Sequence, residues 1–141
     1  MRQQTLQVEH ELQQEREKGR DARALAWLRG LNVLYVMRAK RVLLGRETKY
    51  NRVDMDLCEE GDAMRVSRRH AVIALKRNCE FYIHNIGMRP FDVNGKEVVP
   101  GHRAKLRNND LLSICGLAFS FEINTVLHQK IQKQLNQKIK S

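Results

Sequence analysis

Between residues 32 and 123, apolar and polar side chains alternate with a period of two, in short runs separated by turn-forming residues. In the last run, Leu117, Phe119 and Phe121 share one face, and the side chains between them share the other. This alternation is typical of half-buried strands, because successive side chains of a strand point to opposite sides. At least nine such runs follow one another, at residues 33–38, 41–45, 53–57, 71–76, 80–84, 91–93, 96–99, 111–115 and 117–123.

These runs predict an all-β fold, an antiparallel β-sandwich that spans residues 32–124. A parallel sheet would need helical crossovers, and no helical pattern separates the strands. Asn94-Gly95 lies between two short apolar runs and is the preferred dipeptide of a two-residue hairpin, because both of its central residues need a positive φ.

Residues 1–31 show a different pattern, with many Gln, Glu and Arg side chains and almost no β-branched residue. This composition predicts a polar N-terminal helical arm. Ala24, Trp27 and Leu31 fall at three- and four-residue spacing, which is the spacing of one helix face. Two interpretations are open. The last two turns of the arm dock on the globular body while the rest projects, or the arm is solvated and becomes ordered only in a larger assembly or in the full-length protein.

Residues 125–141 predict a C-terminal amphipathic helix. Leu127, Ile131 and Leu135 recur at four-residue spacing, with lysines and glutamines between them. Three roles are open for this apolar face. It covers the sandwich, packs on the N-terminal arm, or binds a partner protein.

Composition restricts the class of protein. The chain has 141 residues and a net charge of +10, and its hydrophobic fraction of 42% is too high for a disordered chain. The length suits one globular domain with tails. No apolar run approaches the ~18 residues of a membrane span, and the first residues carry no apolar signal segment. We expect neither membrane insertion nor secretion.

The sequence lacks the motifs of common enzyme classes. It contains no G-x-S-x-G, no phosphate-binding glycine loop and no H-E-x-x-H. The three cysteines are far apart and outside any C-x-x-C pair, which indicates a reducing compartment, and no histidine spacing assembles a metal site with them. We expect no catalytic residue, no cofactor and no metal ion.

Two basic motifs lie in loops at predicted strand ends. Gly45-Arg46 ends one strand, and Ser67-Arg68-Arg69-His70 precedes another. Loops at one end of a sandwich commonly present binding groups. These motifs suit a phosphate group, because a guanidinium binds its oxygens bidentately and a serine hydroxyl supplies a further donor. We expect His70 to brace its loop rather than to act as an acid or base.

The order and spacing of several motifs resemble those of the forkhead-associated (FHA) domain family, over about ninety residues. The resemblance implies a sandwich of eleven strands whose apical loops bind phosphothreonine in a partner protein. The motifs that carry it are Gly45-Arg46, Ser67-Arg68-x-His70, Val93-Asn94-Gly95, Leu111–Ile114, and Phe119 with Phe121.

The resemblance also implies roles for individual residues. Arg46 and Ser67 would contact the phosphate, and Arg68 would contact peptide backbone or phosphate. The residues expected to brace the loops are Gly45, His70 and Gly95. The residues expected to bind the phosphopeptide are Arg46, Ser67, Arg68, Arg69, Arg89 and Asn94.

One segment departs from the family pattern. FHA domains usually carry Asn-Gly-Thr a few residues before the hairpin, and this chain has Arg89-Pro90-Phe91 there. An arginine side chain attracts a phosphate but cannot reproduce the paired donor and acceptor of an amide. The acidic segment at residues 59–62 precedes Ser67 and would weaken anion binding if it covered the site.

Three further stretches, at residues 36–40, 44–49 and 53–57, and both helical flanks are similar to the C-terminal FHA region of the microspherule protein family. This similarity implies a protein of the nucleus, with nucleolar, centrosomal and spindle roles in the same family. The implied partners are subunits of histone-acetyltransferase (non-specific lethal) and chromatin-remodelling complexes.

Two other functions are open from the sequence. The chain could be a phosphate-independent scaffold that binds a partner subunit through the sandwich face and the flanking helices. Its net charge also suits a basic nucleic-acid-binding accessory domain. Most aromatic residues fall in core register, however, and few stacking platforms such as Tyr50 and Tyr82 remain. Nucleic acid is therefore expected only as a secondary partner.

Overall fold

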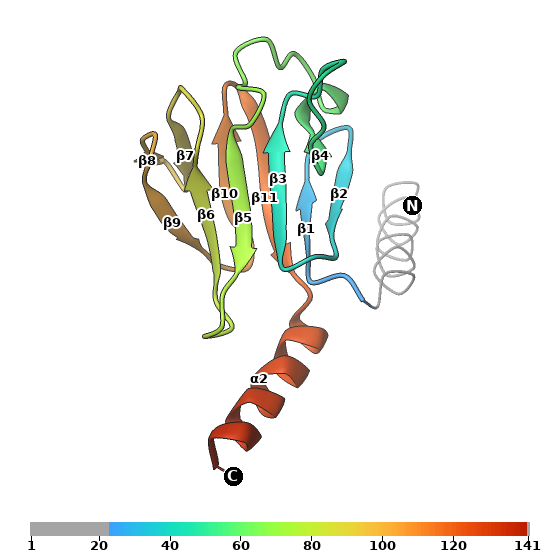
Figure 1. Cartoon of the computed structure of the whole chain (residues 1–141), viewed down its shortest axis with the longest axis vertical. Coiled ribbons are helices and arrows are strands. Elements are labelled where there is room, and N and C mark those ends of the chain that lie inside the picture. Colours follow the sequence, from blue (N-terminus) through green and yellow to red (C-terminus); the bar gives the residue numbers. More distant parts are fainter. Residues whose placement is uncertain (1–22, 141) are drawn as a thin grey trace, which may run out of the picture.

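The computed structural model describes residues 23–140, in which eleven strands form a β-sandwich followed by an α-helix (Figure 1). This confirms the predicted all-β fold class. The strands are β1 (Ala26–Arg29), β2 (Leu34–Met37), β3 (Arg41–Gly45), β4 (Met55–Asp56), β5 (Ala71–Leu75), β6 (Phe81–Asn85), β7 (Phe91–Val93), β8 (Lys96–Val98), β9 (Arg103–Leu106), β10 (Asp110–Ile114) and β11 (Leu117–Ile123). A short 3-10 helix, η1 (Leu57–Glu59), follows β4, and α2 (Thr125–Lys140) follows β11.

The sandwich consists of a six-stranded and a five-stranded sheet. The strand orders are β2-β1-β11-β10-β7-β8 and β4-β3-β5-β6-β9. The pairs are antiparallel, except that β4 pairs in parallel with the end of β3. The core lies between the sheets, where Phe81 meets Phe121 edge to face with ring centroids 5.2 Å apart.

Strand β1 corrects the prediction for the N-terminal arm. Ala26–Arg29 is a strand that pairs with β2 and β11, not the end of a helix. Ala26 and Leu28 are fully buried, whereas Leu31 lies in the turn after β1 and is 92% exposed. The three- and four-residue spacing of apolar residues suggested a helix face. Consecutive apolar residues also fit a strand that is covered on both faces, which is the structure found here. Residues 1–22 of the expected arm lie outside the described residues.

Strand β9 is the other strand that the alternation did not predict. Its sequence is Arg-Ala-Lys-Leu, and among these residues only Leu106 is fully buried. It pairs with β6 at the edge of the five-stranded sheet, where charged side chains can face solvent. Each of the nine predicted runs coincides with a strand, although β4 is limited to two residues.

The predicted C-terminal helix is confirmed as α2, which extends from the end of the sandwich opposite the β3–β4 and β4–β5 connections (Figure 1). Asn124 caps this helix, because its side-chain oxygen accepts a hydrogen bond from Leu127 N at 3.2 Å. Its Nδ2 donates to Ala24 O at 2.8 Å, which joins the helix start to the segment before β1. Within residues 23–140, no helix is long and apolar enough to cross a membrane.

Candidate functional site

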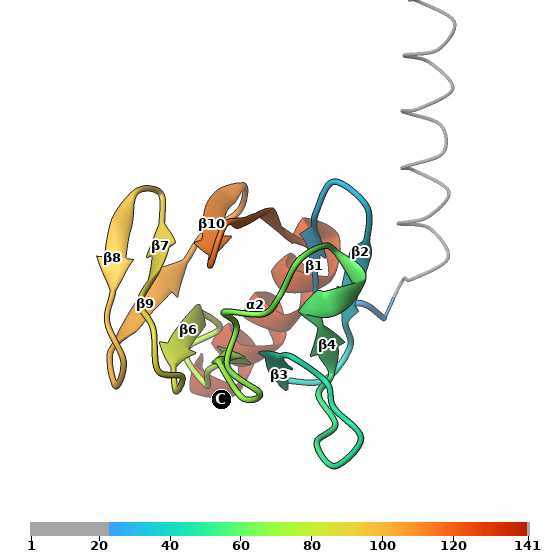
Figure 2. The ribbon, with the colours of Figure 1, turned by 90° about the horizontal axis from the view of Figure 1, so that it is seen from above.

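Three connections, β3–β4, β4–β5 and β6–β7, lie at the end of the sandwich opposite α2 (Figure 1). Viewed from above, the β4–β5 segment crosses this end of the sandwich (Figure 2). Five of the six residues expected to bind the phosphopeptide lie in these connections. We call them the apical cluster: Arg46, Ser67, Arg68, Arg69 and Arg89.

Gly45 allows the end of β3 to approach the β4–β5 segment. A Cβ atom at Gly45 would lie 2.1 Å from the carbonyl oxygen of Arg68, so a larger residue requires a backbone shift. This close approach allows a backbone hydrogen bond, in which Arg46 N donates to Ser67 O at 3.1 Å. The two basic motifs of the sequence are thereby joined.

The Arg46 side chain is half-buried and held by the β4–β5 segment. Its Nε donates to Val66 O at 3.1 Å. Within the described part of the chain, the two terminal guanidinium nitrogens have no hydrogen-bond partner. They can therefore bind an anion bidentately, and the Nε bond reduces the side-chain entropy that would be lost on binding.

Ser67 is held by two neighbours. Its Oγ accepts a hydrogen bond from Met88 N of the β6–β7 connection at 3.0 Å, and its backbone N–H donates to Nδ1 of His70 at 3.0 Å. Because Oγ acts as an acceptor toward Met88, its hydroxyl hydrogen can be donated to a ligand.

His70 is fully buried and connects the β4–β5 and β6–β7 segments. Since Nδ1 accepts from Ser67, the neutral ring carries its proton on Nε2, which donates to Arg89 O at 2.9 Å. Burial lowers the pKa of His70 below its ordinary value, against an opposing effect of the hydrogen bond to Arg89. The neutral ring therefore positions both loops, and its nitrogens are not available for acid–base chemistry.

Asn85 and Gly87 were not singled out by the motif analysis, yet they complete the β6–β7 connection. Asn85 is 1% exposed, donates through Nδ2 to Arg89 O at 2.9 Å and accepts from Gly87 N at 2.9 Å. Gly87 packs on the ring of His70, because a Cβ there would lie 2.6 Å from Cδ2. The Arg89 backbone is thus fixed by two buried polar side chains.

Asn51 joins the β3–β4 connection to the same site. Its Nδ2 donates to Arg46 O at 3.3 Å and to Arg68 O at 3.0 Å. This residue was also missed by the motif analysis. It places the β3–β4 loop beside the segment that carries Arg68 and Arg69.

Glu60, from the acidic segment before Ser67, does not compete with an anion at the apical cluster. It is 5% exposed, and its carboxylate accepts from the backbone N–H groups of Leu31, Asn32 and Val33 at 2.8, 2.9 and 3.0 Å. Burial alone would raise the pKa of Glu60, but these three hydrogen bonds stabilise the charged form and lower it. The carboxylate holds the β1–β2 turn.

Replacing Glu60 by glutamine is expected to lower the free energy of unfolding by about 2 kcal/mol at pH 7, because a charged acceptor is lost and an amide donor then faces backbone donors. The folded-state pKa of Glu60 lies below the ordinary 4.5, so this contribution is present above pH 4.5 and is lost as the pH falls through the folded-state value. Urea unfolding at pH 7 and pH 3 measures both effects. The exposed neighbour Glu59→Gln is the control, and equal stability of the two variants at pH 7 would contradict the assignment.

Residues 42–115 match the FHA domain family, which is just over half of the 141 residues. The chain belongs to the FHA domain family. The match extends from β3 to the residue after β10, so it includes all three connections that carry the apical cluster. FHA domains are interaction modules rather than enzymes.

Two plant FHA proteins are similar in sequence to this chain. The FHA domain-containing protein FHA1 of Arabidopsis thaliana is 35% identical over 98 residues, which are 68% of this chain and 39% of that protein. The transcriptional activator FHA1 of Nicotiana tabacum is 35% identical over 106 residues, which are 73% of this chain and 51% of that protein. The chain thus spans about two fifths to one half of the length of these relatives.

Solved FHA structures share the fold. The N-terminal FHA domain of S. cerevisiae Rad53p, in complex with a phosphothreonine peptide, aligns with a TM-score of 0.64 at 18% identity over 74% of this chain and 98% of that one. Mycobacterium tuberculosis EmbR, in complex with a low-affinity phosphopeptide, aligns with a TM-score of 0.59 at 25% identity over 71% of this chain and 24% of that one. At 18% identity, the likeness to the Rad53p domain concerns the fold alone.

The segment in which this FHA domain departs from the usual pattern, Arg89-Pro90-Phe91, is held in place by other means. Phe91 is 2% exposed and its ring centroid lies 6.0 Å from that of His70, so it is a core residue where threonine is usual. Arg89 is exposed, while its carbonyl accepts from His70 and Asn85. Its side chain adds a cation, not an amide, to the apical cluster.

Asn94 and Gly95 lie in the turn between β7 and β8, so the structure does not bring Asn94 together with the other residues expected to bind the peptide. Their φ angles of 51° and 80° and the pairing of β7 with β8 confirm the predicted hairpin. The Asn94 side chain donates to Asp110 Oδ1 at 2.9 Å and accepts from Leu111 N at 2.8 Å. Asp110 and Leu111 are the first two residues of β10. The contact with the β4–β5 segment is made at the opposite end of this strand, by Cys115.

Proposed function

We propose that the apical cluster binds a phosphorylated threonine of a partner protein. The observation that carries this proposal is the pairing of Arg46 with Ser67, whose backbones are joined at 3.1 Å and whose side chains both keep donors for an anion. The phosphopeptide in the EmbR structure supports the same class of ligand.

In this proposal, Arg46 binds two phosphate oxygens through its terminal nitrogens, and Ser67 donates its hydroxyl hydrogen to a phosphate oxygen. Arg68, Arg69 and Arg89 are exposed on the same connections and attract the phosphate or acidic residues beside it. The buried polar groups position these side chains and do not touch the ligand.

The proposal extends to the cellular setting. The stretches at residues 36–40, 44–49 and 53–57 resemble microspherule protein 1, and the tobacco relative is a transcriptional activator. On this basis the chain serves a nuclear chromatin-regulating complex, with partners among histone-acetyltransferase (non-specific lethal) and chromatin-remodelling subunits. Nucleolar, centrosomal and spindle locations belong to the same proposal. Affinity purification from nuclear extract, with and without phosphatase, tests it.

A phosphothreonine peptide library and the same library without phosphate test the ligand directly. We expect the best phosphopeptide to bind at least about tenfold more tightly than its unphosphorylated form, because phosphate adds charge-assisted hydrogen bonds. Ser67→Ala should weaken that binding about tenfold or more. Ser113→Ala, at an exposed position on β10, is the matched control. Equal affinity of the wild type for both peptide forms would refute the proposal.

A phosphate-independent scaffold is the second candidate function. The observation that favours it is Arg89-Pro90-Phe91, since this segment supplies no amide to hold a peptide backbone and places a core phenylalanine at the usual threonine. Co-purification with an unphosphorylated partner fragment from bacteria would support the scaffold. Strict dependence of complex formation on a kinase would eliminate it.

A further inference from the structure

A groove lies between α2 and the β5–β6 turn. Both elements are at the end of the sandwich opposite the apical cluster (Figure 1). The volume of the groove is about 430 Å³. Leu75 and Cys79 supply apolar surface from the sandwich, and Ile131 and Leu135 supply it from the helix. We call it the basal groove. Its cationic side chains are Lys40, Lys76, Arg77 and Lys138.

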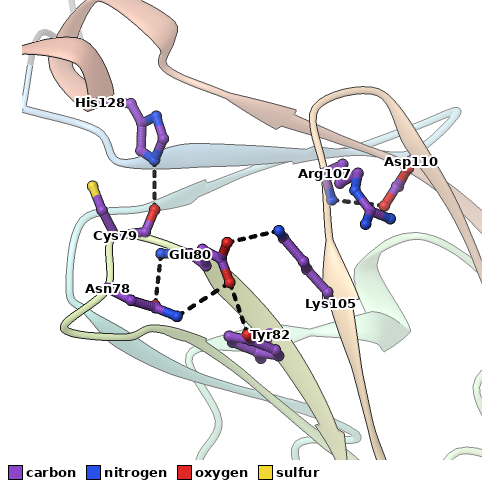
Figure 3. Close-up of polar contacts among 8 residues, drawn as sticks. All are labelled: Asn78, Cys79, Glu80, Tyr82, Lys105, Arg107, Asp110 and His128. Carbon is purple, nitrogen blue, oxygen red and sulfur yellow. Dashed lines mark hydrogen bonds and ion pairs between the residues drawn. The ribbon is translucent and has the colours of Figure 1, made fainter. Parts of the chain in front are cut away.

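The basal groove has a defined shape because α2 is attached to the turn. His128 Nε2 donates to Cys79 O at 2.6 Å (Figure 3), and its ring centroid lies 6.0 Å from that of Phe81. The cap at Asn124 adds a second attachment, to Ala24 at the start of the described chain. Two attachments one helical turn apart set the direction in which the helix leaves the sandwich.

The charge of the basal groove is of one sign. Among the residues that the structure describes, no acidic residue lines it, and the sequence of α2 contains none between residues 125 and 140. The acid of the turn, Glu80, is engaged elsewhere, because its Oε1 pairs with Lys105 Nζ at 2.7 Å and its Oε2 accepts from Tyr82 OH at 2.8 Å (Figure 3). An apolar floor is therefore bordered by the cations of the sandwich, Lys40, Lys76 and Arg77.

We propose that the basal groove binds an acidic amphipathic segment of a partner protein. Its volume is of a size that two or three apolar side chains can fill, and Ile131 and Leu135 are half-buried with surface left for such contacts. Carboxylates that flank these side chains meet Lys40, Lys76 and Arg77 on the sandwich. Charge complementarity of this kind selects the partner and speeds its association. The contact requires no phosphate, so it is independent of the apical cluster.

Fluorescence anisotropy with a labelled peptide of about 16 residues, carrying leucines at i, i+4 and i+7 and glutamates elsewhere, tests this proposal on the full chain. We expect saturable binding that weakens as salt is raised. Lys76→Glu with Arg77→Glu should weaken it about tenfold, and Leu135→Asp should do the same by removing an apolar contact. The control is Lys133→Glu, an exposed residue of α2 that does not line the groove and that should change affinity less than about twofold.

Other occupants are outcomes of the same experiment. Equal binding of a polyglutamate peptide without leucines, or of single-stranded DNA of equal charge, would overturn the proposal, because the groove would then be a general polyanion site. Displacement of the probe by a peptide of residues 1–22 would also overturn it, since the occupant would be a segment of this chain. Circular dichroism of each variant verifies that α2 and the sandwich persist, and a Leu135→Asp variant that is folded yet binds normally would refute the apolar contact.

Discussion

Gly45→Ala is expected to lower the free energy of unfolding by about 3 kcal/mol and to lower the melting temperature by about 10 °C. The added Cβ would lie 2.1 Å from Arg68 O and 2.8 Å from its carbonyl carbon, which are backbone atoms and cannot rotate away. The end of β3 and the β4–β5 segment must therefore separate. Their separation breaks the hydrogen bond from Arg46 N to Ser67 O and moves the two residues on which phosphate binding depends.

Thermal and urea unfolding of Gly45→Ala measure this loss, with Gly61→Ala as the control. Gly61 is exposed, and a Cβ there meets only a methyl group of Leu117 at 3.1 Å, which can move. We expect the control to change stability by less than about 1 kcal/mol. If both alanines are tolerated equally, the close approach at Gly45 is not a structural requirement.

The alternation of apolar residues was sufficient to predict most of the sandwich, because nearly every strand has one face toward the core. It failed at two strands for different reasons. Ala26–Arg29 is buried on both faces beside β11 and shows no period of two, whereas Arg103–Leu106 alternates but is a short edge strand with a single large apolar side chain, Leu106. Family resemblance supplied the number of eleven strands that the pattern alone did not.

The apical cluster was predictable only in part, for a different reason. Arg46, Ser67 and His70 were found because their motifs lie at strand ends, but Asn51 and Asn85 act through hydrogen bonds to distant backbone atoms. Asn51 lies in a loop, where no local signal separates a buried brace from a solvent-exposed residue. A polar residue at a position that the alternation marks as buried was the one signal that could have found Asn85.

The roles of the acidic residues were also not predictable from the sequence alone. The run of acids at residues 59–62 suggested a negative loop beside the phosphate site, but Glu60 accepts three hydrogen bonds from the β1–β2 turn. Its partners lie about thirty residues earlier in the chain, and Gly30 permits the contact because a Cβ there would overlap the carboxylate. Charge counts along a sequence do not reveal which charges are already compensated by backbone donors.

Arg46→Ala is expected to weaken binding of a phosphothreonine peptide at least about 100-fold, because it removes two charge-assisted hydrogen bonds of about 1.5–3 kcal/mol each. The variant also loses the bond from Nε to Val66 O, which should cost only about 1 kcal/mol of stability. Arg46→Lys retains the charge but not the planar fork, so its affinity should fall between those of the wild type and the alanine variant. Isothermal titration with the best peptide of the library measures all three.

An arginine at the opposite end of the sandwich provides a matched control for the Arg46→Ala prediction. Arg77 is exposed at the opposite end, so Arg77→Ala should bind the phosphopeptide with unchanged affinity but bind the acidic leucine peptide more weakly, whereas Arg46→Ala should show the reverse. Both variants remove the same charge, and long-range attraction would therefore affect both probes alike. A loss of phosphopeptide affinity in Arg77→Ala as large as that in Arg46→Ala would show that net charge, rather than the guanidinium beside Ser67, governs binding.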